Sequence, residues 1–555
     1  MLQLLSIPLS LGQKNVLMIA VDDLRHAGAA FGAPEILMPN LDALAKRSVV
    51  FREAFVQAAT CGVSRSSLLT SRRPDTTKVV GNGACPFTTD PAHNGWNSLP
   101  QYFKTQGYET AGFGKIFHPN ICDGAIAGEQ AAAWTVPYYH APCISLGSIY
   151  NGSCYESFPG GDPHLPEGPG GKVTSVYSNS TPASGDTMPD GYIAEHAIAL
   201  LKTLAARQVN DAAGTTTTAK PFFMAVGFHK PHLPHIAPQE YFDLYPLEKV
   251  SLPDNQSRYG PQDAPDIAWN GNGEFLSYTD TKDYNKKHKI AAQEPWMNDT
   301  FVRMQRRAYM ASASYTDANI GSLLKALEAT GVADNTIIAL WGDHGWHIGE
   351  NNEWAKHTAM TWANRAPLLF AVPGLTSSGG AVSEDFAEFV DIMPTLTDFA
   401  GLPVPPRCKS VLDSQTSELC TEGASLKPVV RRLVAKTAAL LETRKSTGFE
   451  PLLVSEGGKV AAFGQWPKGG KMGYIVHTRG AANELLRYTE WVRYNASKKG
   501  PVNSPIWDCD KTVKCAELYN RTADPNENYN IAQQPGMSAV VTKLADMLHA
   551  GWRAL

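Results

Sequence analysis

Four apolar segments of this chain end in charged or histidine side chains, and this repeated pattern constrains the fold more than any other feature. The segments are NVLMIAVDD (15–23), YETAGFGK (108–115), PFFMAVGFHK (221–230) and NTIIALWGDHG (335–345). An uninterrupted apolar run of this kind is typical of a parallel strand that is covered on both faces. Segments with apolar residues at helical spacing, such as 39–51 and 308–330, lie between them. This alternation predicts a doubly wound α/β sheet.

The chain divides into three parts by character. Residues 15–430 carry the strand and helix alternation, and we expect them to form one large domain. After them come short β-like pieces joined by turns, such as MGYIVHT and AELYN, so residues 431–555 are expected to form a smaller α+β subdomain. Residues 1–14 are either the remnant of a signal peptide or an N-terminal extension.

Charge and cysteine content indicate the class of protein. The net charge of −4 does not indicate nucleic-acid binding. No apolar run reaches the ~20 residues needed to span a membrane. Nine cysteines are present, and three close pairs in Gly-, Pro- and Ser-rich surroundings predict disulfide loops of an oxidising compartment. The expected pairs are Cys143–Cys154, Cys408–Cys420 and Cys509–Cys515, and Cys85–Cys122 is a weaker fourth.

Six N-glycosylation sequons add to the case for the secretory route. Each three-residue pattern is weak alone, because it is common by chance. The acceptor residues are Asn151, Asn179, Asn255, Asn298, Asn495 and Asn520.

The strand ends carry a candidate site for a metal ion and an anion. Asp22 and Asp23 end one apolar segment and Asp343 ends another, and ligands of open α/β sheets collect at these carboxyl ends. Three carboxylates suit a hard divalent ion, Ca²⁺ or Mg²⁺, while bases at the other strand ends suit an anion. Each residue alone has a structural explanation, as a helix cap, a turn or a solvated surface group. Their shared position at successive strand ends favours hydrolysis of an oxyanion ester.

Cys61 lies in a polar stretch, TCGVSRSSLLTSRRPDT (60–76), with an arginine four residues later. A thiol close to cationic groups is usually reactive, because positive charge favours the thiolate. Pairing eight cysteines in disulfides leaves one over, and Cys61 is the odd one.

The stretch that begins at Cys61 resembles the signature of the formylglycine-dependent sulfatases, in which the cysteine precedes a serine and an arginine. Other islands resemble the iduronate-2-sulfatase branch more than the arylsulfatases: VDDLR, GFGKIFHP, GFHKPHLP, GDHGWHIGENNEWAKHT and MGYIVHTRGAANELLRYTEWVRYN. The resemblance covers nearly the whole chain apart from residues 120–215 and 255–300. One departure is Val63, which stands where the family has proline and bears on recognition by the modifying enzyme.

The resemblance implies an alkaline-phosphatase/sulfatase-like mixed sheet in which residues 15–430 are catalytic. It also implies that a formylglycine-generating enzyme oxidises Cys61 to formylglycine. One hydroxyl of the aldehyde hydrate then attacks sulfur, and the covalent sulfo-enzyme collapses to release sulfate. The implied ligands of one Ca²⁺ per chain are Asp22, Asp23, Cys61, Asp343 and His344. The implied catalytic set is Cys61, Arg65, Lys115, His118, His229 and Lys356. The implied substrate-binding residues are Lys115, His229, Trp346, His347 and Lys356.

We therefore expect a sulfuric ester hydrolase, lysosomal or secreted, that removes 2-O-sulfate from terminal uronic acid (iduronate) residues of sulfated glycosaminoglycans. One alternative is a sulfatase for another sulfated polysaccharide. A second is a phosphate or phosphonate hydrolase of the same superfamily, although phosphatases there commonly keep serine or threonine as nucleophile. A third is an inactive sulfatase-like protein that binds sulfated glycans, and the intact set of strand-end residues argues against it.

Overall fold

The structure is a computed structural model that describes residues 13–554 with gaps. The residues that it does not describe within that range are 88–95, 119–131, 142–174, 179–187, 213–218, 255–259, 279–280, 283, 285–296, 377–379, 444–452, 455–457, 495–506, 508 and 510–514.

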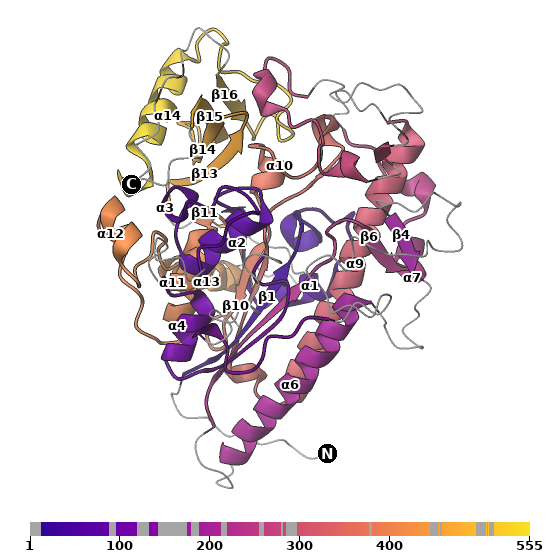
Figure 1. Cartoon of the computed structure of the whole chain (residues 1–555), viewed down its shortest axis with the longest axis vertical. Coiled ribbons are helices and arrows are strands. Elements are labelled where there is room, and N and C mark those ends of the chain that lie inside the picture. Colours follow the sequence, from indigo (N-terminus) through magenta and orange to yellow (C-terminus); the bar gives the residue numbers. More distant parts are fainter. Residues whose placement is uncertain are drawn as a thin grey trace.

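A mixed eight-stranded sheet forms the centre of the molecule (Figure 1). Its order is β12-β11-β2-β10-β7-β1-β5-β3. β10 runs antiparallel to β2 and β7, whereas the other neighbouring pairs are parallel. The strands are β1 (Asn15–Val21), β2 (Val49–Phe55), β3 (Glu109–Gly114), β5 (Phe222–Phe228), β7 (Thr336–Gly342), β10 (Leu368–Ala371), β11 (Ala381–Glu388) and β12 (Leu453–Val454). The expected α/β sheet is confirmed, and the four apolar segments form the contiguous parallel block β7-β1-β5-β3.

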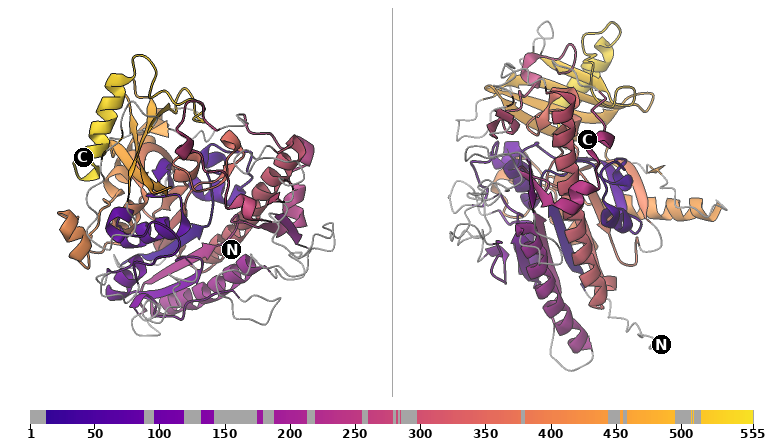
Figure 2. Two further views of the ribbon diagram at one scale, coloured as in Figure 1. Left: turned by 45° about the horizontal axis from the view of Figure 1, so that its top comes forward. Right: turned by 90° about the vertical axis from the view of Figure 1, so that its right-hand side faces the viewer.

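Alternate residues of β1 show how both faces of the sheet are buried. Leu17, Ile19 and Val21 join one hydrophobic core, and Met18 and Ala20 join another. Helices that contribute to the first core include α1 (Pro39–Ala45), α6 (Pro189–Ala212) and α9 (Asp299–Ala329). Those of the second are α2 (Cys61–Thr70), α4 (Leu99–Thr105), α11 (Ile392–Phe399) and α13 (Lys427–Thr443). Figure 2 shows the long helices α6 and α9 running along the sheet.

A second, antiparallel sheet covers one end of the large one. It contains β13 (Ala461–Lys468), β14 (Lys471–Arg479), β15 (Leu485–Arg493) and β16 (Ala516–Asn520), and α14 (Ser538–Ala550) packs against it. The β13–β14 hairpin turns at Gly469 and Gly470, which both have positive φ, as a two-residue hairpin requires. The right-hand view of Figure 2 shows this sheet above the large one.

The small sheet begins at Ala461, about thirty residues after the expected division at residue 430. Helix α13 spans that position and Leu433 packs in the second core of the large sheet. β12 also pairs with β11 of the large sheet. The change in sequence character therefore precedes the small sheet, and the division at 430 stays a prediction.

Short elements complete the described chain. They are β4 (Ser175–Ser178), β6 (His235–Pro238), β8 (His347–Ile348), β9 (Trp354–Ala355), α3 (Pro74–Thr77), α7 (Gln239–Asp243), α10 (Thr361–Asn364) and α12 (Val411–Thr416). None of the described helices combines the length and the apolar character that crossing a membrane requires.

Disulfides join Cys408 to Cys420 and Cys509 to Cys515, two of the pairs expected from their spacing. The expected pair Cys143–Cys154 lies outside the described residues, as does Cys122. Cys85 is disulfide-bonded.

Two of the six sequons fall on described residues. Asn298 is exposed, and its side chain accepts a hydrogen bond from the backbone N–H of Phe301 as the N-cap of α9. Asn520 ends β16, and its side chain accepts hydrogen bonds from two backbone N–H groups of the following turn. Asn151, Asn179, Asn255 and Asn495 lie outside the described residues.

Candidate active site

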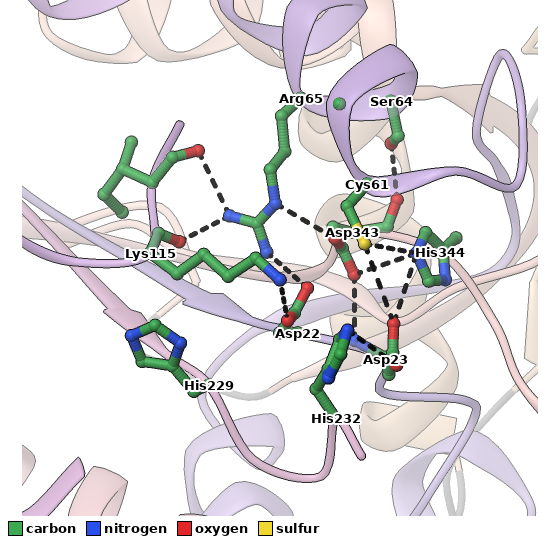
Figure 3. A network of polar contacts seen from close by, with 12 residues as sticks. Asp22, Asp23, Cys61, Ser64, Arg65, Lys115, His229, His232, Asp343 and His344 are labelled. Carbon is green, nitrogen blue, oxygen red and sulfur yellow. Dashed lines mark hydrogen bonds and ion pairs between the residues drawn. The ribbon is translucent and has the colours of Figure 1, made fainter. Parts of the chain in front are cut away.

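The carboxyl ends of the parallel strands and the start of α2 bring the candidate residues together (Figure 3). Asp22 and Asp23 follow β1, Asp343 and His344 follow β7, and Lys115 follows β3. Asp23 has a left-handed backbone conformation, with φ of +58°, which aspartate tolerates better than most residues do. The chain therefore turns sharply after β1, at the point where two carboxylates enter the site.

Helix α2 is buried along its whole length, including its polar residues. Such a helix shows no apolar stripe in its sequence, because protein surrounds it on all sides. Its first residue is Cys61, and Arg65 lies one turn later on the same helix face. Ser64 donates a hydrogen bond to the backbone carbonyl of Asp343, which ties α2 to the end of β7.

Three buried cations are paired with the three aspartates. Arg65 bridges two of them, with Nη2 3.0 Å from Oδ1 of Asp22 and Nε 3.0 Å from Oδ2 of Asp343. Lys115 forms an ion pair with Asp22, and Lys356 Nζ lies 2.8 Å from Oδ1 of Asp23. These six side chains, which we call the strand-end cluster, are almost completely excluded from solvent.

The ionised form of Asp23 is disfavoured in this cluster. Burial raises its pKa well above the usual value, and the neighbouring carboxylates of Asp22, Glu274 and Asp343 raise it further, against the opposing charge of Lys356. Two sets of ligand atoms here each lie within 4.8 Å of one another: Asp23, Cys61, Asp343 and His344; and Asp22, Asp23, Cys61 and His232. Crowded carboxylates of this kind fit a hard divalent cation.

Cys61 is buried at the centre of the site and is the free cysteine among the described residues. Its Sγ lies 3.3 Å from Nε2 of His344 and 3.9 Å from Oδ1 of Asp23. Burial raises the pKa of this thiol well above the usual value, although Lys356 and Lys115 act in the opposite direction. The expectation of a thiolate favoured by nearby cations is therefore wrong for the unmodified side chain, because desolvation outweighs the attraction.

Two histidines, His118 and His229, are expected to handle protons. Figure 3 places the His229 ring beside Lys115, opposite His344. Burial lowers the pKa of His229 well below the usual value, and the charge of Lys115 lowers it further. His229 is therefore a neutral imidazole near pH 7. His118 follows Lys115 by three residues and is half-buried.

Trp346 and His347 are as deeply buried as the side chains of the strand-end cluster. Trp346 is 1% exposed and packs in the core beneath Lys356, whose Nζ lies 5.1 Å from the ring centre. His347 is 0% exposed and its Nε2 lies 3.0 Å from the hydroxyl of Thr358. The expected contacts of these two residues with a sugar stay a prediction, because Lys356, another expected substrate-binding residue, is equally buried.

Two site residues were not found from the sequence. His232 lies 3.8 Å from Asp23, and it belongs to the GFHKPHLP motif, which could have revealed it. Glu274 lies 3.2 Å from Lys356, but it comes from a stretch without a recognisable motif.

The comparisons with known proteins identify the family of the chain. The family model described as Sulfatase matches residues 14–402. The chain is 33% identical to iduronate 2-sulfatase of Homo sapiens and 32% identical to that of Mus musculus, over 93% of this chain and 90% of each relative.

Solved structures show the same fold. A phosphonate monoester hydrolase from Silicibacter pomeroyi gives a TM-score of 0.64 at 20% identity, covering 98% of this chain and 96% of that one. A protein in complex with its substrate D-glucosamine-2-N,6-O-disulfate gives 0.62 at 19% identity, with 98% of both chains covered. Because the family model spans well over half of the chain and the full-length relatives exceed 30% identity, this chain belongs to the sulfatase family.

Proposed function

We propose that this sulfatase hydrolyses 2-O-sulfate esters of terminal uronic acid (iduronate) residues in sulfated glycosaminoglycans, with residue 61 as its nucleophile after conversion to formylglycine. The observation that carries the proposal is the position of Cys61. It is a disulfide-free cysteine, buried among three carboxylates and two lysines at the N-terminus of a buried helix.

The unmodified thiol is a poor candidate for this chemistry, since burial keeps it protonated. An aldehyde at this position supplies, as its hydrate, two hydroxyls on one carbon, one to accept the sulfuryl group and one to release it. Maturation would require a formylglycine-generating enzyme as a partner.

Arg65 fixes the geometry around residue 61. Its guanidinium donates to Asp22 and Asp343 and also to the backbone carbonyls of Lys115 and Ile116. A rigid fork of donors suits this role better than a single ammonium would.

Lys115 and Lys356 are proposed to bind the sulfate oxygens. Both lysines remain charged. Burial opposes their charge, but the neighbouring aspartates outweigh burial and raise the pKa values of the two lysines above the usual value. When a cation takes the carboxylate oxygens, the two ammonium groups become available for an anion.

The donor set fits Ca²⁺, which prefers carboxylate oxygens. We propose that Asp22, Asp23, Asp343, His344 and the modified residue 61 hold one ion. When bound, this ion supplies positive charge next to the sulfate oxygens.

His118 and His229 are proposed to move protons. His118 would take a proton from the hydroxyl of residue 61, and the neutral His229 ring would donate an N–H hydrogen bond to the leaving sugar oxygen. A neutral imidazole stabilises this oxygen without having to hold a full charge in a buried position.

The substrate class and the location rest on the relatives. Both full-length relatives at 32–33% identity are iduronate 2-sulfatases. A lysosomal or secreted location accords with the disulfides Cys408–Cys420 and Cys509–Cys515.

The test is the intact mass of the peptide containing Cys61, from protein made in a eukaryotic secretory host. Conversion to the aldehyde lowers the mass by about 18 Da, and the same preparation should release sulfate from a disaccharide with a terminal 2-sulfated iduronate. A panel of other sulfated polysaccharides serves as the control for substrate class. Active protein with an unmodified Cys61 contradicts the mechanism, and release only from another glycan contradicts the substrate.

A further inference from the structure

Glu274 reaches the strand-end cluster from a loop that is clamped onto the segment before Lys356. Asn272 accepts a hydrogen bond from the backbone N–H of Trp354 at 2.6 Å and donates one to the carbonyl of Asn352 at 2.9 Å. The backbone N–H of Asn270 donates to Glu353 at 2.6 Å. The position of Glu274 relative to Lys356 is therefore fixed by the fold and not by the ion pair alone.

The carboxylate of Glu274 lies among three basic groups. Its Oε1 is 3.2 Å from Nζ of Lys356 and 3.7 Å from Nε2 of His232, and its Oε2 is 3.6 Å from Nδ1 of His357. Oε2 is buried and accepts no hydrogen bond from any residue that the structure describes. Glu274 thus has spare acceptor capacity beside the ammonium group proposed to bind sulfate.

Lys356 forms ion pairs with two carboxylates, those of Asp23 and Glu274. Asp23 holds its Nζ at 2.8 and 3.0 Å, but Asp23 is also a proposed ligand of the cation. Once a cation occupies those oxygens, Glu274 remains as the partner that keeps Lys356 in place.

Glu274 also sets the charge of the site. The strand-end cluster balances three cations against three carboxylates, and Glu274 adds one negative charge. Nearby, Lys230 Nζ donates to the backbone carbonyls of His232 and Pro234, and Asp190 accepts from the backbone N–H groups of His229 and Lys230.

With a divalent ion bound, this count gives a site of charge +1. The reaction is ROSO₃⁻ + H₂O → ROH + SO₄²⁻ + H⁺, so the reactant carries one negative charge and the product carries two. The site is neutral with the ester bound and carries −1 with sulfate bound.

We propose that Glu274 is a specificity-determining residue that makes the site favour the singly charged sulfate ester over the doubly charged sulfate product, and so promotes product release. This inference rests on the proposed function, because it takes the strand-end cluster as the sulfate site.

The experiment compares two anions of similar size and different charge, methyl sulfate and inorganic sulfate. Their affinities for the full-length, ion-loaded protein are measured by calorimetry, without turnover of the natural substrate. In Glu274→Gln the ratio of sulfate to methyl sulfate affinity should rise by between about tenfold and a hundredfold, because one nearby negative charge is removed. Glu274→Asp keeps the charge and should leave the ratio close to that of the wild type.

Glu353→Gln is the matched control. This carboxyl is also buried next to the same loop, but burial raises its pKa to about 8, so the substitution removes little charge near pH 7. Its anion ratio should match that of the wild type. If Glu274→Gln does not fold, the pair Glu274→Asp and Glu274→Asn repeats the comparison of charge with a shorter side chain.

An unchanged ratio in the neutral variants overturns the proposal and leaves Glu274 with a purely structural role. A wild type that binds neither anion overturns it as well, because the sulfate site is then elsewhere. A wild type that shows the charge preference but releases no sulfate from any ester contradicts the proposed function and leaves the charge selection standing.

Discussion

Two groups of charges inside this molecule differ in how their carboxylates are neutralised. The strand-end cluster crowds carboxylates together, and burial with the neighbouring carboxylates holds the pKa of Asp23 above its usual value. The second group lies between the two sheets, where Glu53 of β2 accepts from Arg365 at 3.0 Å and from Arg521 at 2.7 and 3.1 Å.

Although burial raises the pKa of Glu53, Arg521 and Arg365 outweigh it and hold that pKa below the usual value. The comparison teaches that buried charge by itself does not mark a functional site. Two arginines saturate the oxygens of Glu53, and no further ligand is needed there. The strand-end cluster brings like charges together at a cost in folding, which a bound cation would offset.

The largest effect is expected at the centre of the strand-end cluster. Cys61→Ala should lower kcat/KM for a sulfate ester by at least about 10⁴-fold, because it removes the nucleophile of a covalent mechanism. Thermal unfolding should change little, since the side chain is small. If the loss of activity comes with a large loss of stability, Cys61 has a structural role and not a catalytic one.

The next effect is expected between the sheets. Glu53→Gln should destabilise the protein by about 3 to 5 kcal/mol, because it leaves the buried Arg521 and the partly exposed Arg365 without the carboxylate between them. Urea unfolding measures this change, and kcat/KM per folded molecule should stay within about twofold. Glu328→Gln, which breaks the exposed pair of Glu328 with Arg47, is the control and should cost about 0.5 kcal/mol or less. If folded Glu53→Gln loses activity, the charges around Glu53 are also functional, and the contrast with the strand-end cluster is wrong.

The effect that is smallest per pH unit concerns two buried glutamates with opposite pKa shifts. Arg73 and Lys459 outweigh burial and lower the pKa of Glu388 to about 2, so its contribution to stability is present above the usual value near 4.5 and is lost as the pH falls toward 2. Burial raises the pKa of Glu353 to about 8, so its contribution is present below about 4.5 and is lost as the pH rises toward 8.

Glu353→Gln should therefore flatten the decline of stability between pH 5 and pH 8, by up to about 1.4 kcal/mol per pH unit. Urea titrations at several pH values measure the slope. An unchanged slope in the variant would show that Glu353 is ionised at neutral pH in the folded protein.

Much of the site could be predicted because it follows from local pattern. The apolar runs predicted strands, and parallel strands end at one edge of the sheet, so Asp22, Asp343 and Lys115 were expected to meet. The cysteine spacing predicted the pairs Cys408–Cys420 and Cys509–Cys515, and left Cys61 as the odd residue.

Only the tertiary structure decided which polar side chains are excluded from solvent and which side chains they contact. Desolvation depends on every surrounding atom, so the raised pKa of the Cys61 thiol could not be read from the arginine near it in sequence. The full burial of Trp346 and His347 depends on packing in the same way and could not be predicted from their position in the sequence. Glu274 was missed because its partner Lys356 is more than eighty residues away in the chain, and only the folded loop brings the two charges within 3.2 Å. The sequence by itself thus determined the strands and the chemistry at their ends, while the packing of distant segments decided how those groups are charged and shared.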